Sequence, residues 1–407
     1  MMYLYVNRRE DSMSLGARLR QYRTARSYSL DDLVKRMDGL VSKQALSKYE
    51  HDRATPRPTV LAALARALDV NTSQLLAEPR YRFEAVAFRA LSSLPKKERE
   101  AIESTVQLEL ERRLALMDKL GIAPAYPFND VITVADDFSQ VERAAEELRY
   151  AWNLGGGPIS SVVDTLESKG VHLIDVDSGR AFDGLAVIAR DDAGERVACG
   201  VAARLEIARA RQRMNHAHEL GHLAMQVAEC VDEEAAARRF AGAFLYPAEA
   251  VRADFGVRRN RVRVHELLAA KERWGISVQA VLFRLRDLSV IDETNYTWWC
   301  RYVNQAGWRT EEPGEQPRER STWAETHALR AEAEGLIARD ALAQYAPALV
   351  NAESAEPLDR RTLMSLPLSE RRALMKAQAD ALSAQYNRTL DREWLDADLG
   401  EWDSTDD

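Results

Sequence analysis

Cysteine is scarce in this chain of 407 residues, which contains only Cys199, Cys230 and Cys300. Three scattered cysteines are too few for a disulfide framework, and none has the close spacing of a zinc finger. This usage suits a reducing compartment, so we expect a cytoplasmic protein. The chain also lacks a run of about 18 apolar residues, which argues against a membrane span. Its first residues lack the apolar stretch of a signal peptide, and we interpret them as a short leader before Met13.

Aromatic residues are few, at 7%, but 46% of the residues are hydrophobic and 29% are charged. This balance is typical of a soluble globular protein, and the length allows two or three domains. The net charge of −8 is unevenly distributed. Residues 1–80 carry fourteen Lys/Arg against nine Asp/Glu, a balance of +5, so the remainder carries −13. We therefore expect the amino-terminal part to meet a polyanion.

Histidine is rare too, yet three of the seven histidines fall within residues 216–222. His218 and His222 are four residues apart, which places both imidazoles on one face of a helix. The segment from Met214 to Glu229 contains no proline and only one glycine, Gly221, as a helix requires. Such a pair can hold one metal ion while Glu219 reaches a water on that ion. The alternative is an ordinary helix with two surface histidines.

A zinc site that performs chemistry needs a third protein ligand and one position left for water. The next helix, expected from about Glu233 to Leu245, offers Glu229, Glu233 and Glu234. Glu234 shares a stripe with core-facing positions, whereas Glu233 is turned about 100° away and Glu229 precedes the helix. We therefore choose Glu234, with a role limited to the helix dipole as the alternative. His216 projects away from His218 and is interpreted as a non-ligand.

Short helices are predicted over Leu15–Leu76, and the third of them, from Lys43 to about Glu50, has a polar outer face. Amides and hydroxyls can read base edges in the major groove of DNA, and ammonium groups can contact phosphates. The candidate contacts are Ser42, Lys43, Gln44, Ser47 and Lys48. The alternative is a helical bundle used for dimerisation or protein contact.

The stretch from Val41 to Pro56, followed by Val60–Val70, resembles the lambda-repressor/Cro-like (XRE) helix-turn-helix family. The resemblance is carried above all by the run Gln44–Glu50 and by Pro56, and it implies binding to a double-stranded DNA operator. In that family the residue at Glu50 is structural. The turn Asp38–Val41 is about two residues longer than usual, which leaves the angle of the third helix open.

A long helix from Lys96 to about Leu120 is predicted next, with Ile102, Val106, Leu110, Leu114 and Met117 on one stripe. Core packing is one fate for this stripe, and pairing with a second copy as a homodimer is another. Gly121–Pro127 is interpreted as a linker. Beyond it, two helices and three short β-rich runs (residues 171–176, 184–189 and 197–201) precede the histidine helix, which predicts an α+β domain.

The second module resembles the ImmA/IrrE zinc metallopeptidases over roughly residues 140–290. The resemblance is carried by Trp152, Gly157–Ile159, Leu166-Glu167, Asp183-Gly184, Arg211, Arg213, Ala217–His222, Glu234, Ala237, Phe240-Ala241 and Pro247. It implies a zincin-like α+β fold of the gluzincin kind, a Zn²⁺ cofactor, and cleavage of XRE-type repressors. In zinc peptidases of this layout, a sheet edge beside the metal helix binds the substrate backbone. Met214-Asn215 and Tyr246 depart from the family pattern without touching a ligand.

The carboxyl end changes to an Ala-, Glu- and Arg-rich helical composition after Pro317. The stretch Leu366–Met375, with Gln378-Ala379 and Tyr386, resembles the short antitoxin-like modules of toxin–antitoxin operons. Asp391–Asp407 is strongly acidic, with Trp394 and Trp402 interleaved. It is interpreted either as a solvated tail or as a segment that folds onto a basic partner.

These observations predict a multidomain protein, mainly α with an α+β core. The expected regions are a five-helix XRE-type domain (13–80), a helical connector and linker (81–137), an ImmA/IrrE-like zinc metallopeptidase domain (138–292) and a helical carboxyl-terminal region with an acidic tail (293–407). The first functional hypothesis is a DNA-binding regulator whose zinc peptidase, with Glu219 as catalytic base, cleaves a repressor or partner protein. The alternative is an antitoxin-like autorepressor whose peptidase fold binds a toxin or senses a signal and cuts little.

Overall fold

The computed structural model describes residues 13–128, 132–134, 137–179, 181–205, 207–347, 349, 367, 368, 371 and 372. The chain divides into two compact units, Met1–Pro347 and Ala348–Asp407. Apart from four residues of the antitoxin-like stretch, both that stretch and the acidic segment Asp391–Asp407 lie outside the described residues. All elements described below belong to the first unit.

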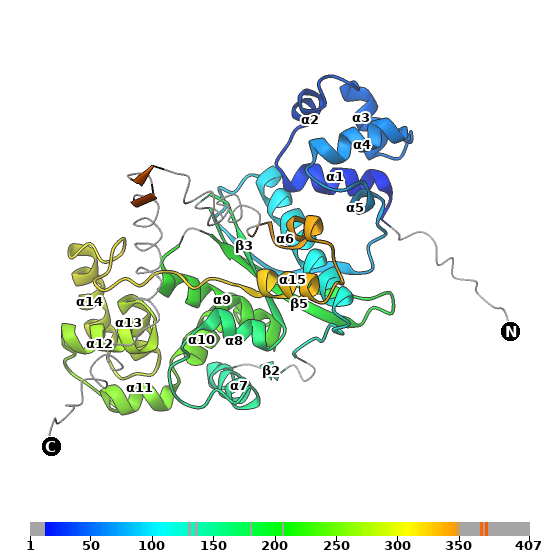
Figure 1. Ribbon diagram of the computed structural model, residues 1–407. Coiled ribbons are helices and arrows are strands. Elements are labelled where there is room, and N and C mark those ends of the chain that lie inside the picture. Colours follow the sequence, from blue (N-terminus) through cyan, green and yellow to red (C-terminus); the bar gives the residue numbers. More distant parts are fainter. Residues whose placement is uncertain are drawn as a thin grey trace, which may run out of the picture. The chain divides into compact units, whose positions relative to one another are not determined.

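The amino-terminal module is helical (Figure 1) and consists of α1 (Leu15–Ala25), α2 (Leu30–Arg36), α3 (Lys43–Glu50), α4 (Pro58–Ala67) and α5 (Thr72–Leu76). Ser29 and Asp32 form a capping box at the start of α2, and the Ser42 hydroxyl accepts a hydrogen bond from the Ala45 amide at the start of α3. Each cap satisfies an amide that the first helical turn leaves unpaired. The apolar faces of these helices meet around Leu46, which is buried.

A four-stranded sheet in the order β1-β4-β5-β3 lies at the centre of the second module. The strands are β1 (Arg82–Ala90), β3 (Val171–Val176), β4 (Phe182–Arg190) and β5 (Arg196–Arg204). β4 is antiparallel to both of its neighbours, whereas β3 and β5 are parallel to each other. The expectation of a purely helical connector over residues 81–137 is wrong at β1. Its three alanines and two arginines have weak strand propensity, whereas Phe83, Val86 and Phe88 favour a strand, and its extended state is completed by pairing with β4.

Helix α6 (Lys96–Lys119) covers one face of this sheet. The predicted stripe is buried there against sheet residues such as Val187 and Ala202, so core packing is the fate that the structure shows. The opposite face of α6 contacts α1: Arg18 donates hydrogen bonds of 2.6 and 2.8 Å to the two carboxylate oxygens of Glu111. Leu108 packs into the core of the amino-terminal helices. One helix therefore contacts both modules.

The other face of the sheet is covered by helices that share its larger core, namely α7 (Phe138–Ala151), α8 (Val162–Ser168), α9 (Arg209–Ala224) and α10 (Glu233–Leu245). The expected helix over Met214–Glu229 ends at Ala224. The next three residues form β6 (Met225–Val227), which pairs in parallel with β2 (Ile132–Val134). The expected linker before β2 also contributes to this core, because Tyr126 is buried in it.

The remaining described elements are α11 (Ala248–Phe255), α12 (Val264–Trp274), α13 (Val278–Asp287), α14 (Glu293–Gln305), α15 (Trp323–Ala333), a 3₁₀ turn (Arg339–Ala341) and α16 (Leu342–Tyr345). Trp274 and Leu285 extend the larger core into α12 and α13. The segment after α14 is tied back to α9 by the buried ion pair between Arg213 and Glu319, whose atoms are 2.5 Å apart. None of the helices that the structure describes is long and apolar enough to cross a membrane.

Candidate functional site

The site is built where α10 crosses closely over α9. His218 and His222 lie one turn apart on the same face of α9, and Gly221 stands between them on the side of α10. A Cβ atom at Gly221 would lie 3.1 Å from Cδ1 of Phe240 and 3.4 Å from Cα of Ala237. Gly221 therefore permits a close approach of the two helices, which offsets the roughly 1 kcal/mol that a helical glycine costs relative to alanine.

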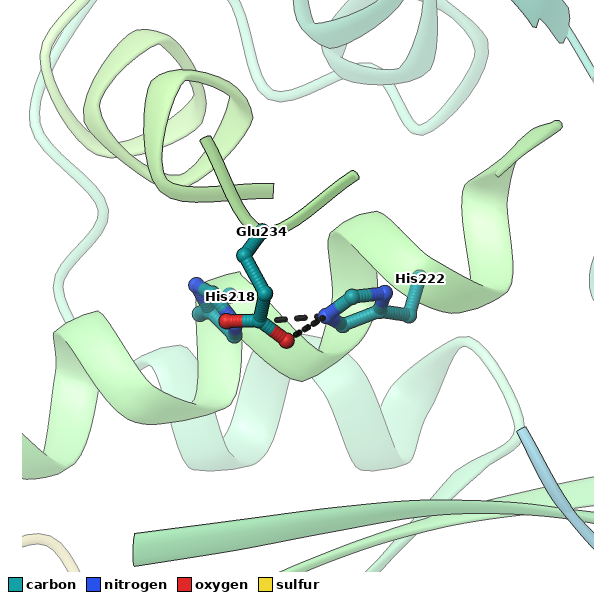
Figure 2. A group of neighbouring side chains, drawn as sticks. All are labelled: His218, His222 and Glu234. Atoms are coloured by element: carbon teal, nitrogen blue, oxygen red, sulfur yellow. Dashed lines mark hydrogen bonds and ion pairs between the residues drawn. The ribbon is translucent and has the colours of Figure 1, made fainter. Parts of the chain in front are cut away.

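Glu234, in the first turn of α10, reaches across to both imidazoles (Figure 2). The Nε2 atoms of His218 and His222 are 3.2 Å apart. One carboxylate oxygen of Glu234 lies 3.4 Å from Nε2 of His218, and the other lies 3.5 Å from Nε2 of His222. The histidines are buried, whereas the Glu234 side chain is 48% exposed. The structure thus brings together the three residues that the sequence analysis chose as metal ligands.

The spacing of these three donor groups fits a tetrahedral zinc ion. Ligand atoms about 2.0–2.1 Å from such an ion lie about 3.3 Å from one another. The two Nε2 atoms are 3.2 Å apart, and each ring has one Glu234 oxygen at a similar distance, Oε2 at 3.4 Å from His218 and Oε1 at 3.5 Å from His222. Without an ion, two imidazole nitrogens in such proximity can share at most one proton, and the Glu234 carboxylate beside them has only acceptor atoms. The donor set therefore suits a metal better than a network of hydrogen bonds.

Glu233 supports the site in a way that the sequence analysis did not foresee. Its Oε1 atom lies 3.0 Å from Nδ1 of His222, the ring nitrogen that faces away from the cluster. A carboxylate at this position fixes the tautomer that leaves Nε2 free to bind a metal. The helical phase predicts that Glu233 points away from the site, but its side chain is long enough to contact the His222 ring. Glu229 precedes α10 and is not part of the cluster.

Glu219 is fully buried beside the cluster. Neither of its carboxylate oxygens has a hydrogen-bond partner among the described residues. Burial raises the pKa of this carboxyl to about 8, while the positive charge of Arg89 opposes the shift. Because an unpaired buried carboxylate is costly to the fold, a structural purpose does not explain Glu219. It is instead suited to exchanging a proton inside the site.

Burial also lowers the pKa of His218 and of His216. Burial, followed by the charges of Arg89 and His222, lowers the pKa of His218 to about 2, so its imidazole is neutral, as a metal ligand must be. His216 is buried too, and burial lowers its pKa to about 4. His216 does not belong to the three-residue cluster, in agreement with its interpretation as a non-ligand.

A cavity of about 930 Å³ opens along the amino-terminal half of α9 and the middle of α10. Met214, one turn before His218, and Arg238, one turn after Glu234, line the cavity. Phe283 and Trp308 add aromatic surface, and Arg309 adds a further positive charge. The metal cluster thus lies on the two helices that also form the walls of a space wide enough for side chains of a bound molecule.

The residues predicted to contact DNA lie on or beside α3. Ser42, Lys43, Gln44 and Lys48 are exposed, and Ser47 is partly exposed. Lys43 forms an exposed ion pair of 2.6 Å with Asp31, and Ser42 caps the helix. Glu50 is buried and accepts hydrogen bonds of 2.5 and 2.7 Å from Arg23 of α1, which agrees with a structural role. Gln44 and Lys48 keep polar ends in solvent, as contact with a groove requires.

Comparison with known protein families supports both modules. Residues 14–78 match the family model of a helix-turn-helix domain, and residues 207–286 match that of the IrrE N-terminal-like domain, a peptidase family. The search of curated proteins gives no match. The second match begins before α9 and ends within α13, and it therefore includes all of the clustered residues. This chain joins a helix-turn-helix domain to an IrrE-like peptidase domain.

Proposed function

We propose that this protein is a DNA-binding transcription regulator whose second module is a zinc-dependent metallopeptidase that cleaves a repressor or another partner protein. One observation carries the enzymatic part. Two imidazoles and a carboxylate at tetrahedral spacing stand beside the buried, unpaired carboxylate of Glu219. Ion-pair networks that serve only stability satisfy their carboxylates, whereas this site leaves one available.

The donor set matches catalytic zinc in particular. Two histidines and one glutamate leave a fourth coordination position for water or substrate, whereas structural zinc sites fill all four with protein ligands. A zinc ion held there would supply Lewis acidity, which polarises a carbonyl and makes water easier to deprotonate. His218, His222 and Glu234 would hold it, and Glu233 would keep the His222 ring oriented.

Glu219 is the residue that moves the proton. It lies next in sequence to His218, and its burial favours the protonated carboxyl, so it takes up a proton readily. In peptide hydrolysis it would accept the proton of the attacking water and return it to the leaving amine. The cavity beside α9 and α10 would receive side chains of the substrate.

The amino-terminal module would place the peptidase on DNA. α3 presents Gln44 and Lys48 to solvent, and residues 1–80 carry a net charge of +5. The module could therefore bind DNA phosphates and contact base edges in the groove. Regulation would follow from cleavage, because removal of a bound repressor or of a partner changes operator occupancy. DNA binding and proteolysis in one chain would then act at the same genetic site.

The test measures bound zinc and proteolysis in parallel on the purified full chain. Zinc is measured by elemental mass spectrometry, and cleavage is measured on casein, on a helix-turn-helix repressor and on the chain itself. We expect stoichiometric zinc and cleavage in the wild type, zinc without cleavage in Glu219→Gln, and neither in His222→Ala. Glu229→Gln is the matched control, since Glu229 is a nearby acidic residue outside the cluster, and it should retain both.

The outcomes separate the proposal from its alternative. Absence of zinc in the wild type would remove the enzymatic function altogether. Stoichiometric zinc with no cleavage of any protein would favour the antitoxin-like autorepressor, in which the peptidase fold serves as a binding surface. Cleavage that persists in Glu219→Gln would remove Glu219 from its role as the base.

A further inference from the structure

The strand whose Gly184 contacts Glu219, β4, is already paired along both of its edges. β4 lies between β5 and β1 and is antiparallel to both. On the β1 side the pairing runs from Arg82 opposite Arg190 to Ala90 opposite Phe182, with register shifts between Ala85 and Ala87 and between Arg89 and Ala90. β1 is therefore the outermost strand on this side, and it arrives from the connection between the helix-turn-helix domain and α6.

The end of β4 that begins at Phe182 lies directly against the metal helix. A Cβ atom at Gly184 would lie 2.3 Å from Oε1 of Glu219, so the β4 backbone and the Glu219 carboxylate are in close contact. The side-chain amide of Asn215, on α9, donates a hydrogen bond of 3.1 Å to the Asp183 carbonyl. A chain that pairs with β4 at Gly184 therefore passes beside Glu219 and the metal ligands.

In this structure the residue that pairs with Gly184 is Arg89. The Arg89 guanidinium donates a hydrogen bond to the side-chain oxygen of Asn215, and its charge acts on both His218 and Glu219. The neighbouring Phe88 packs against Phe182 and belongs to the core under α6. β1 thus presents one basic side chain to the metal helix, and it presents an aromatic side chain to the opposite face of the sheet.

β1 differs from the other strands of the sheet in burial. None of its nine residues is buried, whereas seven of the nine residues of β4 are. Hydrophobic stabilisation scales with the apolar area removed from water, so β1 is held less firmly than β3, β4 or β5. The buried residues of β3, β4 and β5 also pack against helices, so an exchange of β1 for another strand would have to replace the contacts of partly buried residues such as Phe83, Val86 and Phe88.

We propose that β1 is an internal mimic of the peptide substrate: it occupies the β4 edge on which a substrate backbone would pair, and a substrate must displace it. The proposal rests on the proposed peptidase function. Peptides bind exposed sheet edges by adding a strand, which uses backbone hydrogen bonds for affinity and alternate side chains for specificity. β1 already has the antiparallel direction, the register and the proximity to Glu219 that such a peptide needs.

The register also assigns a class of substrate. A competing segment would place one residue opposite Gly184 with its side chain near Asn215, where Arg89 lies now. It would place the preceding residue in the apolar environment of Phe88. The preferred substrate is therefore an extended segment with an aromatic residue followed by a basic one, as in Phe88-Arg89-Ala90.

The first experiment locks β1 onto β4 in the full chain. Ala87 and Ala186 are Cα partners with small side chains, so Ala87→Cys with Ala186→Cys allows a disulfide across the two strands. Cys230→Ser and Cys300→Ser remove the more exposed native thiols. The probe is a fluorescein-labelled peptide with the sequence of residues 81–91, and its binding is followed by anisotropy.

We expect the oxidised chain to bind this peptide at least tenfold more weakly than the reduced chain, and a reductant to restore binding. A peptide with alanine in place of the arginine that corresponds to Arg89 should bind the reduced chain about tenfold more weakly. Equal affinity of the oxidised and reduced chains, with the crosslink verified by mass spectrometry, would overturn the proposal. So would a failure of the reduced chain to bind the peptide at all.

A second measurement needs no engineered cysteine. Arg89→Ala removes the contact of β1 with the metal helix, whereas Glu84→Gln weakens only the exposed ion pair with Arg190 at the far end of the strand. We expect tighter peptide binding by Arg89→Ala and almost none of that gain in Glu84→Gln. Saturating peptide should also speed hydrogen exchange of residues 82–90 in the wild type while β4 stays protected. Unchanged exchange in residues 82–90 contradicts displacement of β1.

These readouts are independent of hydrolysis. Loss of zinc or of cleavage in the earlier experiment would remove the peptidase function. The exchange of β1 for the peptide at the β4 edge could still be measured in that case. Conversely, an active peptidase whose oxidised and reduced forms bind the peptide and cut casein equally well would keep its function and lose this inference.

Discussion

Glu233 and Glu234 are adjacent in sequence, yet they contact opposite nitrogens of the same ring: Glu233 lies 3.0 Å from Nδ1 of His222, and Glu234 lies 3.5 Å from Nε2. We expect Glu233→Gln to weaken zinc affinity about 10–100-fold, because a carboxylate that fixes the tautomer of a metal-bound histidine contributes that much. A competition titration with a zinc chelator measures the change. Glu229→Gln should leave the affinity unaltered, and an equal loss in both variants would contradict an orienting role for Glu233.

Gly221→Ala should destabilise the fold although alanine is the better helix former. The new methyl group would lie 3.1 Å from Phe240, which is fully buried and stacked on Phe244 and so has little room to move. Overpacking of a core costs about 1–3 kcal/mol, against roughly 1 kcal/mol gained in helix propensity. We expect a net loss of about 1 kcal/mol in the free energy of unfolding, measured with urea.

The control for this prediction is the other glycine of the helix pair. A Cβ atom at Gly242 would meet only the Arg284 side chain, at 3.4 Å, which is an ordinary contact. Gly242→Ala should therefore be neutral or stabilising by up to about 1 kcal/mol. If both substitutions stabilise the protein, the close approach of α9 and α10 does not restrict position 221.

For DNA binding, we expect Gln44→Ala and Lys48→Ala to have different effects. An amide that reads a base edge contributes about 1–3 kcal/mol of discrimination, so its loss should narrow the difference between operator and other sequences. Loss of a phosphate contact should weaken binding to all sequences and lower the salt slope by about one. Affinities for operator and scrambled duplexes at several salt concentrations measure both. Wild-type behaviour of both variants would contradict the assignment of α3 as the recognition helix.

The stability of the protein should fall on mild acidification because of His172. Its imidazole is buried against Trp323, and burial lowers its pKa from 6.5 to about 3. Between these two values the unfolded chain binds one proton more than the folded chain, so stability is lost as the pH falls from about 6.5 towards 3. The slope from this group approaches 1.4 kcal/mol per pH unit.

His172→Phe should remove this contribution, so that the variant loses about 2 kcal/mol less than the wild type between pH 7.5 and pH 5. Urea unfolding at both pH values measures the difference. The control is His265→Gln, since His265 is exposed and should leave the slope as it is. Identical pH dependence in His172→Phe and the wild type would show that His172 takes up its proton without unfolding.

The sequence was most informative where local geometry decides the structure. The i, i+4 spacing of His218 and His222 and the helical phase of Glu234 predicted the three clustered residues, because α9 and α10 are regular helices. The sequence was least informative where a strand far away along the chain determines the secondary structure of a segment. β1 becomes a strand only through β4, about a hundred residues further on, and α9 ends at Ala224 because Met225–Val227 pairs with β2. The alternation of Phe83 with Arg82 and Glu84 is a short strand signal, but the register shift between Ala85 and Ala87 interrupts it.

The ion pair between Arg18 and Glu111 gives α6 a mechanical role. This helix holds α1 through two charge-assisted hydrogen bonds on one side, and its apolar stripe packs on the sheet on the other. Rotation of the helix-turn-helix domain against the IrrE-like domain would have to break that pair. Reversal of the charge at Glu111 would thus weaken the contact between α1 and α6, which the packing of Leu108 and the hydrogen bond between Gln21 and Gln107 would still hold, without changing any side chain of α3.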